Sequence, residues 1–146
     1  MGLDMYLYAR DYVGTYYKPE HKPALDAVNF GFPAPVEAYY IQAEIMYWRK
    51  ANQIHNWFVT NVQNGVDECQ YSYVAPEQLV ELRDLIETAI ETKNADLLPP
   101  CSGFFFGSTE VDDWYWQELT DTLSKLNELI EHPNFEQFDY LYRSSW

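Results

Sequence analysis

One twelve-residue stretch gathers most of the side chains in this sequence that could bind a small ligand. The chain from Tyr47 to Phe58 reads YWRKANQIHNWF, which places a guanidinium, an ammonium, three amides and an imidazole near two indole rings. Residues three or four apart share one flank of a helix, so helical spacing would bring several of these groups together. Such a set suits a nucleotide, because basic groups bind phosphate and indole rings stack on bases. The ligand residues predicted here are Trp48, Arg49, Lys50, Asn52, His55 and Asn56.

A purely structural interpretation of this stretch stays open. Trp48 and Trp57 suit a hydrophobic core, and His55 could be a core histidine with hydrogen-bonded nitrogens. Arg49 and Lys50 could pair with nearby acidic residues.

A second candidate lies in residues 103–109, which read GFFFGST. Three successive phenylalanines cannot all point the same way in an extended segment, so we expect Phe105 to face outward or into a pocket. Ser108 and Thr109 precede an expected helix, whose free N–H groups could hold an anion. Neighbouring acidic residues favour a structural role instead, because they already complement the helix dipole.

Catalytic and metal motifs are absent from the sequence. It contains neither His-Glu-x-x-His nor Gly-x-Ser-x-Gly. Asp112 and Asp113 lack the spacing of a calcium loop and fit a solvated helix start. Cys69 and Cys101 are too few for a zinc site or a disulfide framework, and we interpret them as reduced thiols. No metal, cofactor or catalytic residue is therefore predicted.

Composition narrows the classes of partner. Nine basic residues face 23 acidic ones, giving a net charge of −14, which disfavours direct nucleic-acid binding. No apolar run reaches the length of a membrane span, and the first residues do not resemble a secretory signal. We therefore expect a cytoplasmic protein. Aromatic residues make up 18% of the chain, a fraction that suits either a core filled by aromatic rings or a binding surface.

The elements that must position these residues follow from periodicity and from turn residues. Residues 3–9 alternate as a strand, and residues 10–35, which hold four prolines, are expected to form a long loop. Pro76 suits the first turn of a helix, and Thr109 with Asp112 resembles a capping box. The remaining expected elements are strands over 36–43 and 135–142, a short extended segment over 69–74, and helices over 44–64, 76–94 and about 109–131.

Because the three helices stand together between strands, the order predicts an α+β fold. We expect one domain over residues 1–146, with a small, mostly antiparallel sheet and three helices packed on one face. The first, second and last strands would form that sheet.

The combination of three motifs resembles a family of small acidic proteins of tailed bacteriophages and prophages that has no settled function. The motifs are GLDMYL at residues 2–7, YWRKANQIHNWF at 47–58, and LLP at 97–99 followed by GFFFGST at 103–109. The resemblance implies an accessory phage protein made inside a bacterial cell. It carries no catalytic residues over to this chain.

Three functions are weighed on these grounds. The favoured one is a binding protein that sequesters a nucleotide-derived immune signal without catalysis, in a pocket between two subunits of a homo-oligomer. The alternative is an inhibitor that binds a host defence protein through an acidic surface, in its extreme form a mimic of DNA. An enzyme that cleaves a signalling nucleotide, with His55 as its acid or base, is the least favoured.

Overall fold

The computed structural model describes residues 2–13, 19–30 and 38–146, and these form one antiparallel sheet with helices. The α+β class is therefore confirmed, although four α-helices are present among the described residues where three were predicted. The strands are β1 (Asp4–Tyr12), β2 (Tyr40–Arg49), β3 (Ser72–Val74) and β4 (Asp139–Ser145). The α-helices are α1 (Lys22–Phe30), α2 (Asn52–Asn61), α3 (Pro76–Thr92) and α4 (Asp113–Ile130), with short 3-10 turns at Pro19–His21, Ala95–Leu97 and Phe135–Gln137.

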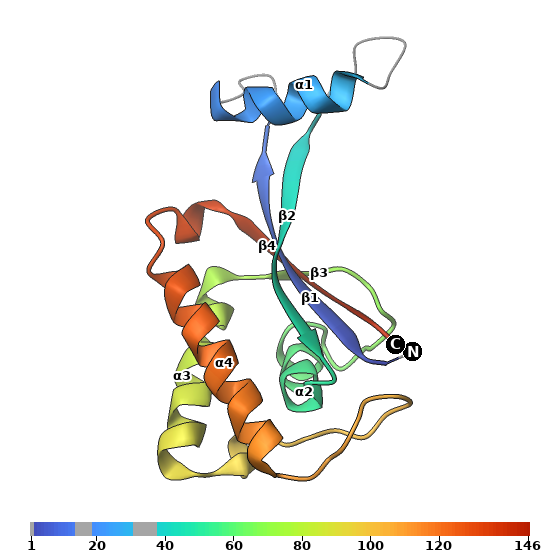
Figure 1. The fold of residues 1–146 in the computed structure, drawn as a ribbon, viewed down its shortest axis with the longest axis vertical. Coiled ribbons are helices and arrows are strands. Elements are labelled where there is room, and N and C mark those ends of the chain that lie inside the picture. Colours follow the sequence, from blue (N-terminus) through green and yellow to red (C-terminus); the bar gives the residue numbers. More distant parts are fainter. Residues whose placement is uncertain (1, 14–18, 31–37) are drawn as a thin grey trace.

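The sheet has the strand order β2-β1-β4-β3, so the first and last strands of the chain lie side by side at its centre. Asp4 pairs with Ser145, which brings the two ends of the chain together (Figure 1). A bulge interrupts the β1–β2 pairing between Leu7 and Tyr8, because one extra residue of β2 lies opposite that step. Bulges increase local twist, and Figure 1 shows the two strands twisting about each other as they leave the body.

Alternation along the strands divides the sheet into two faces. One face carries Leu3, Met5 and Leu7 from the start of the chain, all fully buried, with Met46 and Trp48 beside them. Helices α2 and α4 contact this face, and α3 packs along α4. The ring of Phe58 in α2 stacks on Tyr142 in β4, with centroids 4.0 Å apart. The other face bears the residues that alternate with these and is not covered by α2, α3 or α4.

The β1–β2 hairpin extends beyond the helices, and α1 lies across its far end (Figure 1). The predicted loop 10–35 is therefore wrong over residues 10–12, which complete β1, and over Lys22–Phe30, which forms α1. The loop was predicted from its prolines, but Pro23 lies in the first turn of α1, where the missing N–H costs nothing. Residues 14–18 and 31–35 of that loop lie outside the described residues.

The boundary between the second strand and the first predicted helix is the largest error. Residues 44–49 were expected in a helix, but they belong to β2, and the helix begins only at Asn52. Met46 and Trp48 are buried while Tyr47 and Arg49 are exposed, which is the period of a strand. Lys50, with φ of 59°, turns the chain between the two elements. Of the predicted strand 36–43, residues 40–43 belong to β2, residues 38 and 39 precede it, and residues 36 and 37 lie outside the described residues.

The other boundaries moved less. The predicted last strand begins as a 3-10 turn over Phe135–Gln137 and pairs as β4 only from Asp139. Asp112, rather than Thr109, caps α4, because its carboxylate accepts a hydrogen bond from the Tyr115 N–H at 3.0 Å. Among the described residues, no helix is long and apolar enough to cross a membrane.

Candidate functional site

The predicted ligand residues do not all meet at one site, and Trp48 shows why. Its ring is 2% exposed and packs against Phe58, while Nε1 donates a 2.9 Å hydrogen bond to Thr122 Oγ1 in α4. Both the faces and the polar edge of the indole are therefore occupied. Trp48 is a core residue that joins the sheet to α4, so it cannot stack on a base.

His55 lies at the centre of a buried network and is fully inaccessible to solvent. Its Nε2 lies 2.9 Å from Asp67 Oδ2, and its Nδ1 lies 2.7 Å from the Tyr142 hydroxyl. Because a carboxylate only accepts, Nε2 donates to Asp67 and Nδ1 accepts from Tyr142. Burial, and then the charge of Asp67, raise the pKa of Tyr142 well above its ordinary value. Both imidazole nitrogens are thus hydrogen-bonded within the protein and are not available to a ligand.

Asn52 fixes the 101–108 loop to the first turn of α2. Its amide nitrogen donates to the carbonyl oxygens of Phe106 and Ser108, and its side-chain oxygen accepts from the Cys101 N–H. The amide is almost completely buried. Asn56, one turn later, donates to the Pro99 carbonyl oxygen at 3.1 Å. Asn52 therefore uses both ends of its amide to hold the loop, and Asn56 adds one hydrogen bond to the segment just before it.

Most of the second predicted segment, residues 103–109, also makes contacts that hold the fold together. The Phe105 carbonyl oxygen accepts from the Leu3 N–H, and Ser108 Oγ accepts from the Glu110 N–H. Gly107 has φ of 89° and lies so close to Lys50 that a Cβ there would come within 3.2 Å of Lys50 Cβ. The loop needs glycine at this position. Thr109 and the ring of Phe105 remain exposed, and Phe105 contacts Phe104.

A small cavity of about 330 Å³ brings four of the nine predicted residues together, namely Arg49, Lys50, Asn52 and Ser108. The exposed ring of Trp114, 81% accessible, stands at the same cavity. Three carboxylates, those of Glu110, Asp112 and Glu118, also line it. Burial, followed by the charge of Asp121, raises the pKa of Glu118. The basic pair is therefore offset by acidic groups, which weakens the site for a phosphate.

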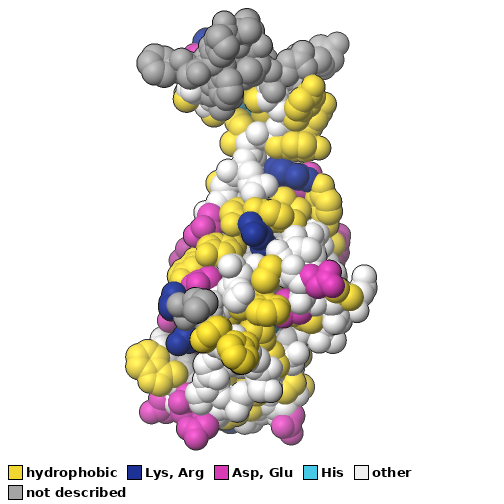
Figure 2. Space-filling model, turned by 90° about the vertical axis from the view of Figure 1, so that its right-hand side faces the viewer, with side chains coloured by type: hydrophobic (Ala, Val, Ile, Leu, Met, Phe, Trp, Pro, Cys, Tyr) yellow, Lys and Arg dark blue, Asp and Glu magenta, His cyan; other side chains and the backbone are white. Residues whose placement is uncertain are grey.

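The uncovered face of the sheet carries an extensive exposed feature that was not predicted from the sequence. The strand register brings side chains from all four strands and from the residues beside β3 onto this face. We name it the aromatic face and define it as Tyr6, Tyr8, Arg10, Tyr12, Tyr40, Tyr47, Arg49, Tyr71, Tyr73 and Arg143. The view in Figure 2 shows hydrophobic side chains mixed with Lys and Arg along the molecule, with many Asp and Glu at its lower end.

Rings on the aromatic face contact one another in a chain across the strands. Tyr6 stacks on Tyr8 at 6.1 Å and contacts Tyr47 at 5.5 Å, and Tyr8 contacts Tyr71 at 5.8 Å. Farther along the hairpin, Tyr12 meets Tyr40 edge to face. Tyr73 is 65% exposed, so the rings are in contact without being buried.

Arginines are held against these rings. The Arg10 guanidinium lies 4.1 Å from the centroid of Tyr40 and also donates to the Tyr73 hydroxyl. Arg143 lies 4.9 Å from the Tyr71 centroid and donates to its hydroxyl at 3.3 Å. The Arg10 guanidinium also lies 5.2 Å from the Tyr73 centroid, so two rings position it. Such cation–π contacts orient a guanidinium. The aromatic face therefore presents charged groups whose geometry is set before anything binds.

Asp4 organises the end of the aromatic face near the termini. Its Oδ1 accepts from the Tyr47 hydroxyl at 2.5 Å and from Arg49 Nη1 at 3.1 Å. The hydrogen bond to Asp4 raises the pKa of Tyr47 above its ordinary value. Arg49, predicted to bind phosphate, is thus paired with a carboxylate on the opposite strand.

One signal in the sequence could have revealed this face. Tyr6, Tyr8, Arg10 and Tyr12 recur at every second position of the first strand, so they must share one side of it. Their partners on the other strands follow only from the register, which depends on pairing between distant segments.

Across residues 2–13, 19–30 and 38–146, no three His, Cys, Asp or Glu side chains are grouped so as to hold a metal ion. No protein-family model, no curated protein and no solved structure matches the chain.

Proposed function

We propose that this is a binding protein that acts without catalysis by holding a partner protein on its aromatic face. The observation that carries the proposal is the pair of arginines, Arg10 and Arg143, fixed over exposed tyrosine rings. Tyrosine and arginine are enriched among the residues that dominate binding energy at protein interfaces. A tyrosine ring also loses little conformational freedom on binding, since it has only two side-chain torsions.

Ring contacts and strand pairing make this surface rigid before binding. The ring contacts restrict the tyrosines, and the sheet beneath them is anchored by a buried core. Ordering an interface side chain otherwise costs about 0.5–1.5 kcal/mol for each long residue. A surface ordered in advance avoids much of that cost.

The charge of the face indicates the chemistry of the partner. Three of the four arginines of the chain, Arg10, Arg49 and Arg143, lie on it, and the register places three carboxylates, those of Asp4, Glu44 and Asp139, on the same face. Arg49 is paired with Asp4, so Arg10 and Arg143, held against the rings, are the arginines that a partner would meet. Guanidinium groups over aromatic rings favour a partner surface that offers carboxylates beside apolar side chains. A nucleic acid would also find stacking surfaces here, but the field of the whole protein opposes a polyanion.

The resemblance to bacteriophage accessory proteins supports a host defence protein as this partner, met in the cytoplasm of a bacterial cell. The inhibitor hypothesis from the sequence is revised, however, in which surface binds the partner. The exposed acids of α3, such as Glu81 and Glu87, would keep the protein soluble, and the aromatic face would make the contact. Mimicry of DNA is not needed in this account.

Affinity capture with matched charge reversals tests the proposal. Arg143→Glu reverses a charge on the aromatic face, and Arg83→Glu makes the same change on α3, where Arg83 bonds Asp84 and Asn127. We expect wild type and Arg83→Glu to capture the same host protein from a bacterial extract, and Arg143→Glu to lose it. Equal capture by both variants, or capture of nucleic acid or of a second copy of the chain alone, would overturn the assignment.

Sequestration of a nucleotide-derived signal is the second candidate, and the small cavity at Arg49, Lys50 and Trp114 supports it. Trp114 replaces Trp48 as the ring that could stack on a base. Mass spectrometry of small molecules released by heating the protein, after incubation with extract from cells with active nucleotide signalling, tests this. An intact nucleotide bound to wild type and absent from Trp114→Ala would favour sequestration, whereas an empty wild-type protein would exclude it under those conditions.

A further inference from the structure

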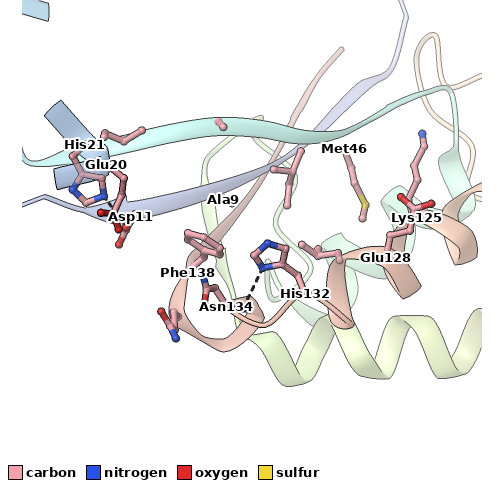
Figure 3. Close-up of a pocket in the computed structure, with 15 residues that line it drawn as sticks. Ala9, Asp11, Glu20, His21, Met46, Lys125, Glu128, His132, Asn134 and Phe138 are labelled. Carbon is pink, nitrogen blue, oxygen red and sulfur yellow. Dashed lines mark hydrogen bonds and ion pairs between the residues drawn. The ribbon is translucent and has the colours of Figure 1, made fainter. Parts of the chain in front are cut away.

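Two cavities lined by described residues differ in whether a ligand could reach an unpartnered polar group. The larger, of about 640 Å³, lies between the hairpin and the end of α4, and Figure 3 shows Met46 and Phe138 pointing into it. His21 lines this cavity and carries an unpaired atom, Nδ1, but that atom is closed to solvent, so nothing in the cavity can reach it. The smaller cavity, of about 330 Å³ at the start of α2 and α4, has unpartnered polar groups that are accessible.

Gln53, in the first turn of α2, lines the smaller cavity with an amide that has no partner. The residue is 5% exposed, so its side chain is almost completely buried. Within residues 2–13, 19–30 and 38–146 its amide makes no hydrogen bond, whereas the amide of neighbouring Asn52 makes three. Unlike His21 Nδ1, neither amide atom of Gln53 is closed to solvent. Buried polar groups nearly always have partners, so this amide indicates a ligand.

Helix α4 adds a carboxylate and an aromatic ring to the same cavity. Trp114 and Glu118 are one helical turn apart, so they share one flank of α4, and both line the cavity. The carboxylate of Glu118 is half-buried and has no hydrogen bond or ion pair in the part of the chain that the structure describes. Because a carboxylate only accepts, it needs a donor from a ligand. The ring of Trp114 is exposed and free to stack.

The charges at this cavity favour a cation. Two further carboxylates, those of Glu110 and Asp112, line it. Of its two basic groups, Arg49 is paired with Asp4, which leaves the ammonium of Lys50. Three carboxylates therefore stand against one unpaired ammonium. The net charge of −14 also attracts cations to the protein as a whole.

The geometry of these groups selects among cations. A guanidinium is planar, matches the two oxygens of a carboxylate with two parallel N–H groups, and stacks on aromatic rings. It keeps further N–H groups for another acceptor. An ammonium is a strongly hydrated point charge, so it would use the carboxylate but gain less from the indole ring.

We propose that this cavity binds a monosubstituted guanidinium group, which donates to the Glu118 carboxylate and to Gln53 Oε1 while its plane stacks on Trp114. Free small guanidines and arginine side chains share this head group. The inference goes beyond both candidate functions, because it does not use the aromatic face and it gives the small cavity a ligand opposite in charge to a nucleotide.

Four probes with different head groups test this chemistry. Butylguanidinium carries the proposed group, butylurea has its planar shape without the charge, and butylammonium has the charge without the planar fork. Guanosine monophosphate represents the nucleotide alternative. The readout is NMR of the Gln53 side-chain amide and of the Trp114 indole N–H. The indole N–H of Trp48 is the internal reference, because it is buried and donates to Thr122.

We expect butylguanidinium to shift the Gln53 and Trp114 resonances but not that of Trp48, with a Kd on the order of 1 mM for a ligand of this size. Butylurea and butylammonium should bind at least about tenfold more weakly, since each loses part of the charge-assisted pair. Equal binding of butylurea would overturn recognition of charge, and equal binding of butylammonium would overturn recognition of the planar group. Tighter binding of guanosine monophosphate would overturn the preference for a cation, and no shift with any probe would overturn the site.

Three variants locate the binding. Glu118→Gln keeps the shape of the side chain but removes its charge, so it should weaken butylguanidinium at least about tenfold and leave butylurea within about twofold. Gln53→Met keeps the length of the side chain but removes its amide, and it should also weaken butylguanidinium. Glu128→Gln is the matched control, because it makes the same change on α4 away from this cavity. Retained binding in Glu118→Gln, equal loss of butylurea, or equal loss in Glu128→Gln would contradict the placement.

A blocked peptide, acetyl-Gly-Arg-Gly-amide, distinguishes the two sources of the head group. Tighter binding than butylguanidinium would assign the site to an arginine of a protein, and weaker binding would assign it to a free small guanidine. Either result requires that binding be lost in Glu118→Gln, and binding of the peptide that survives this change would contradict the site.

Discussion

Replacing Tyr142 by phenylalanine isolates one hydrogen bond in the buried network around His55. The change removes a single oxygen and keeps the ring that stacks on Phe58 with 7° between their planes. No cavity opens beyond the space of that atom, so packing terms stay nearly constant. The perturbation is therefore confined to the 2.7 Å bond between the Tyr142 hydroxyl and His55 Nδ1.

The expected cost follows from what remains behind. His55 has no solvent exposure, so its Nδ1 loses its partner and cannot gain a water without rearrangement. A buried acceptor left unsatisfied costs about 1–3 kcal/mol. For a domain of this length each kcal/mol lowers the Tm by roughly 2–4 °C. We therefore expect Tyr142→Phe to lower the Tm by roughly 2–12 °C.

Urea unfolding followed by circular dichroism, with the Tm measured in parallel, provides the assay. Tyr12→Phe is the control, because the ring of Tyr12 is exposed and its change should stay within about 0.5 kcal/mol. A cost for Tyr142→Phe that is no larger than for Tyr12→Phe would refute the reasoning. It would mean that the His55 network does not exist as described or that it does not stabilise the fold.

Three further predictions follow from the described contacts. Asn52→Ala removes three hydrogen bonds to the 101–108 loop, so amide exchange at Cys101 should speed up and unfolding should cost about 2–3 kcal/mol less. Burial raises the pKa of Glu118, so its charge opposes folding at pH 7; Glu118→Gln should raise the Tm there, and the gain should vanish below about pH 4.5 in parallel melts. Burial raises the pKa of Tyr140 to about 12, above its unfolded value near 10, so stability should fall between pH 10 and 12 in urea titrations, less steeply in Tyr140→Phe.

Sequence patterns predicted the elements in which the period of the apolar residues matches the face that is buried. Helix α3 was found because Pro76 marks its start and Leu79, Leu82 and Ile86 form one buried stripe. Strand β1 was found because Leu3, Met5 and Leu7 alternate with polar residues. In both segments the chain's own period matches the face that is buried, so no distant contact was needed to assign them.

The errors arose where a distant contact decides the outcome. The segment Glu44–Arg49 fits a helical spacing that continues into α2, but pairing with β1 keeps it extended. In the extended conformation Trp48 points inward and donates a hydrogen bond to Thr122, which lies 74 residues later. The predicted ligand cluster assumed a helix that includes Trp48. Trp48 lies in β2 instead, and its side chain is buried, so the cluster does not form. His55 fits its structural alternative, because Asp67 and Tyr142 occupy both its nitrogens.

The aromatic face could not be predicted from the sequence for the same reason. The aromatic face needs the register of four strands, and a sequence shows only the alternation of Tyr6, Tyr8 and Arg10 on one of them.

Site-specific photocrosslinking in bacterial cells tests the central claim about the aromatic face most directly. A benzophenone amino acid replaces exposed Tyr71 on the aromatic face, and in a matched protein it replaces exposed Glu87 on α3. The account predicts one discrete protein adduct from position 71, none from position 87, and loss of the adduct when Arg143→Glu is added. Adducts of equal yield from both positions, or an adduct at position 71 that nuclease digestion removes, would contradict it.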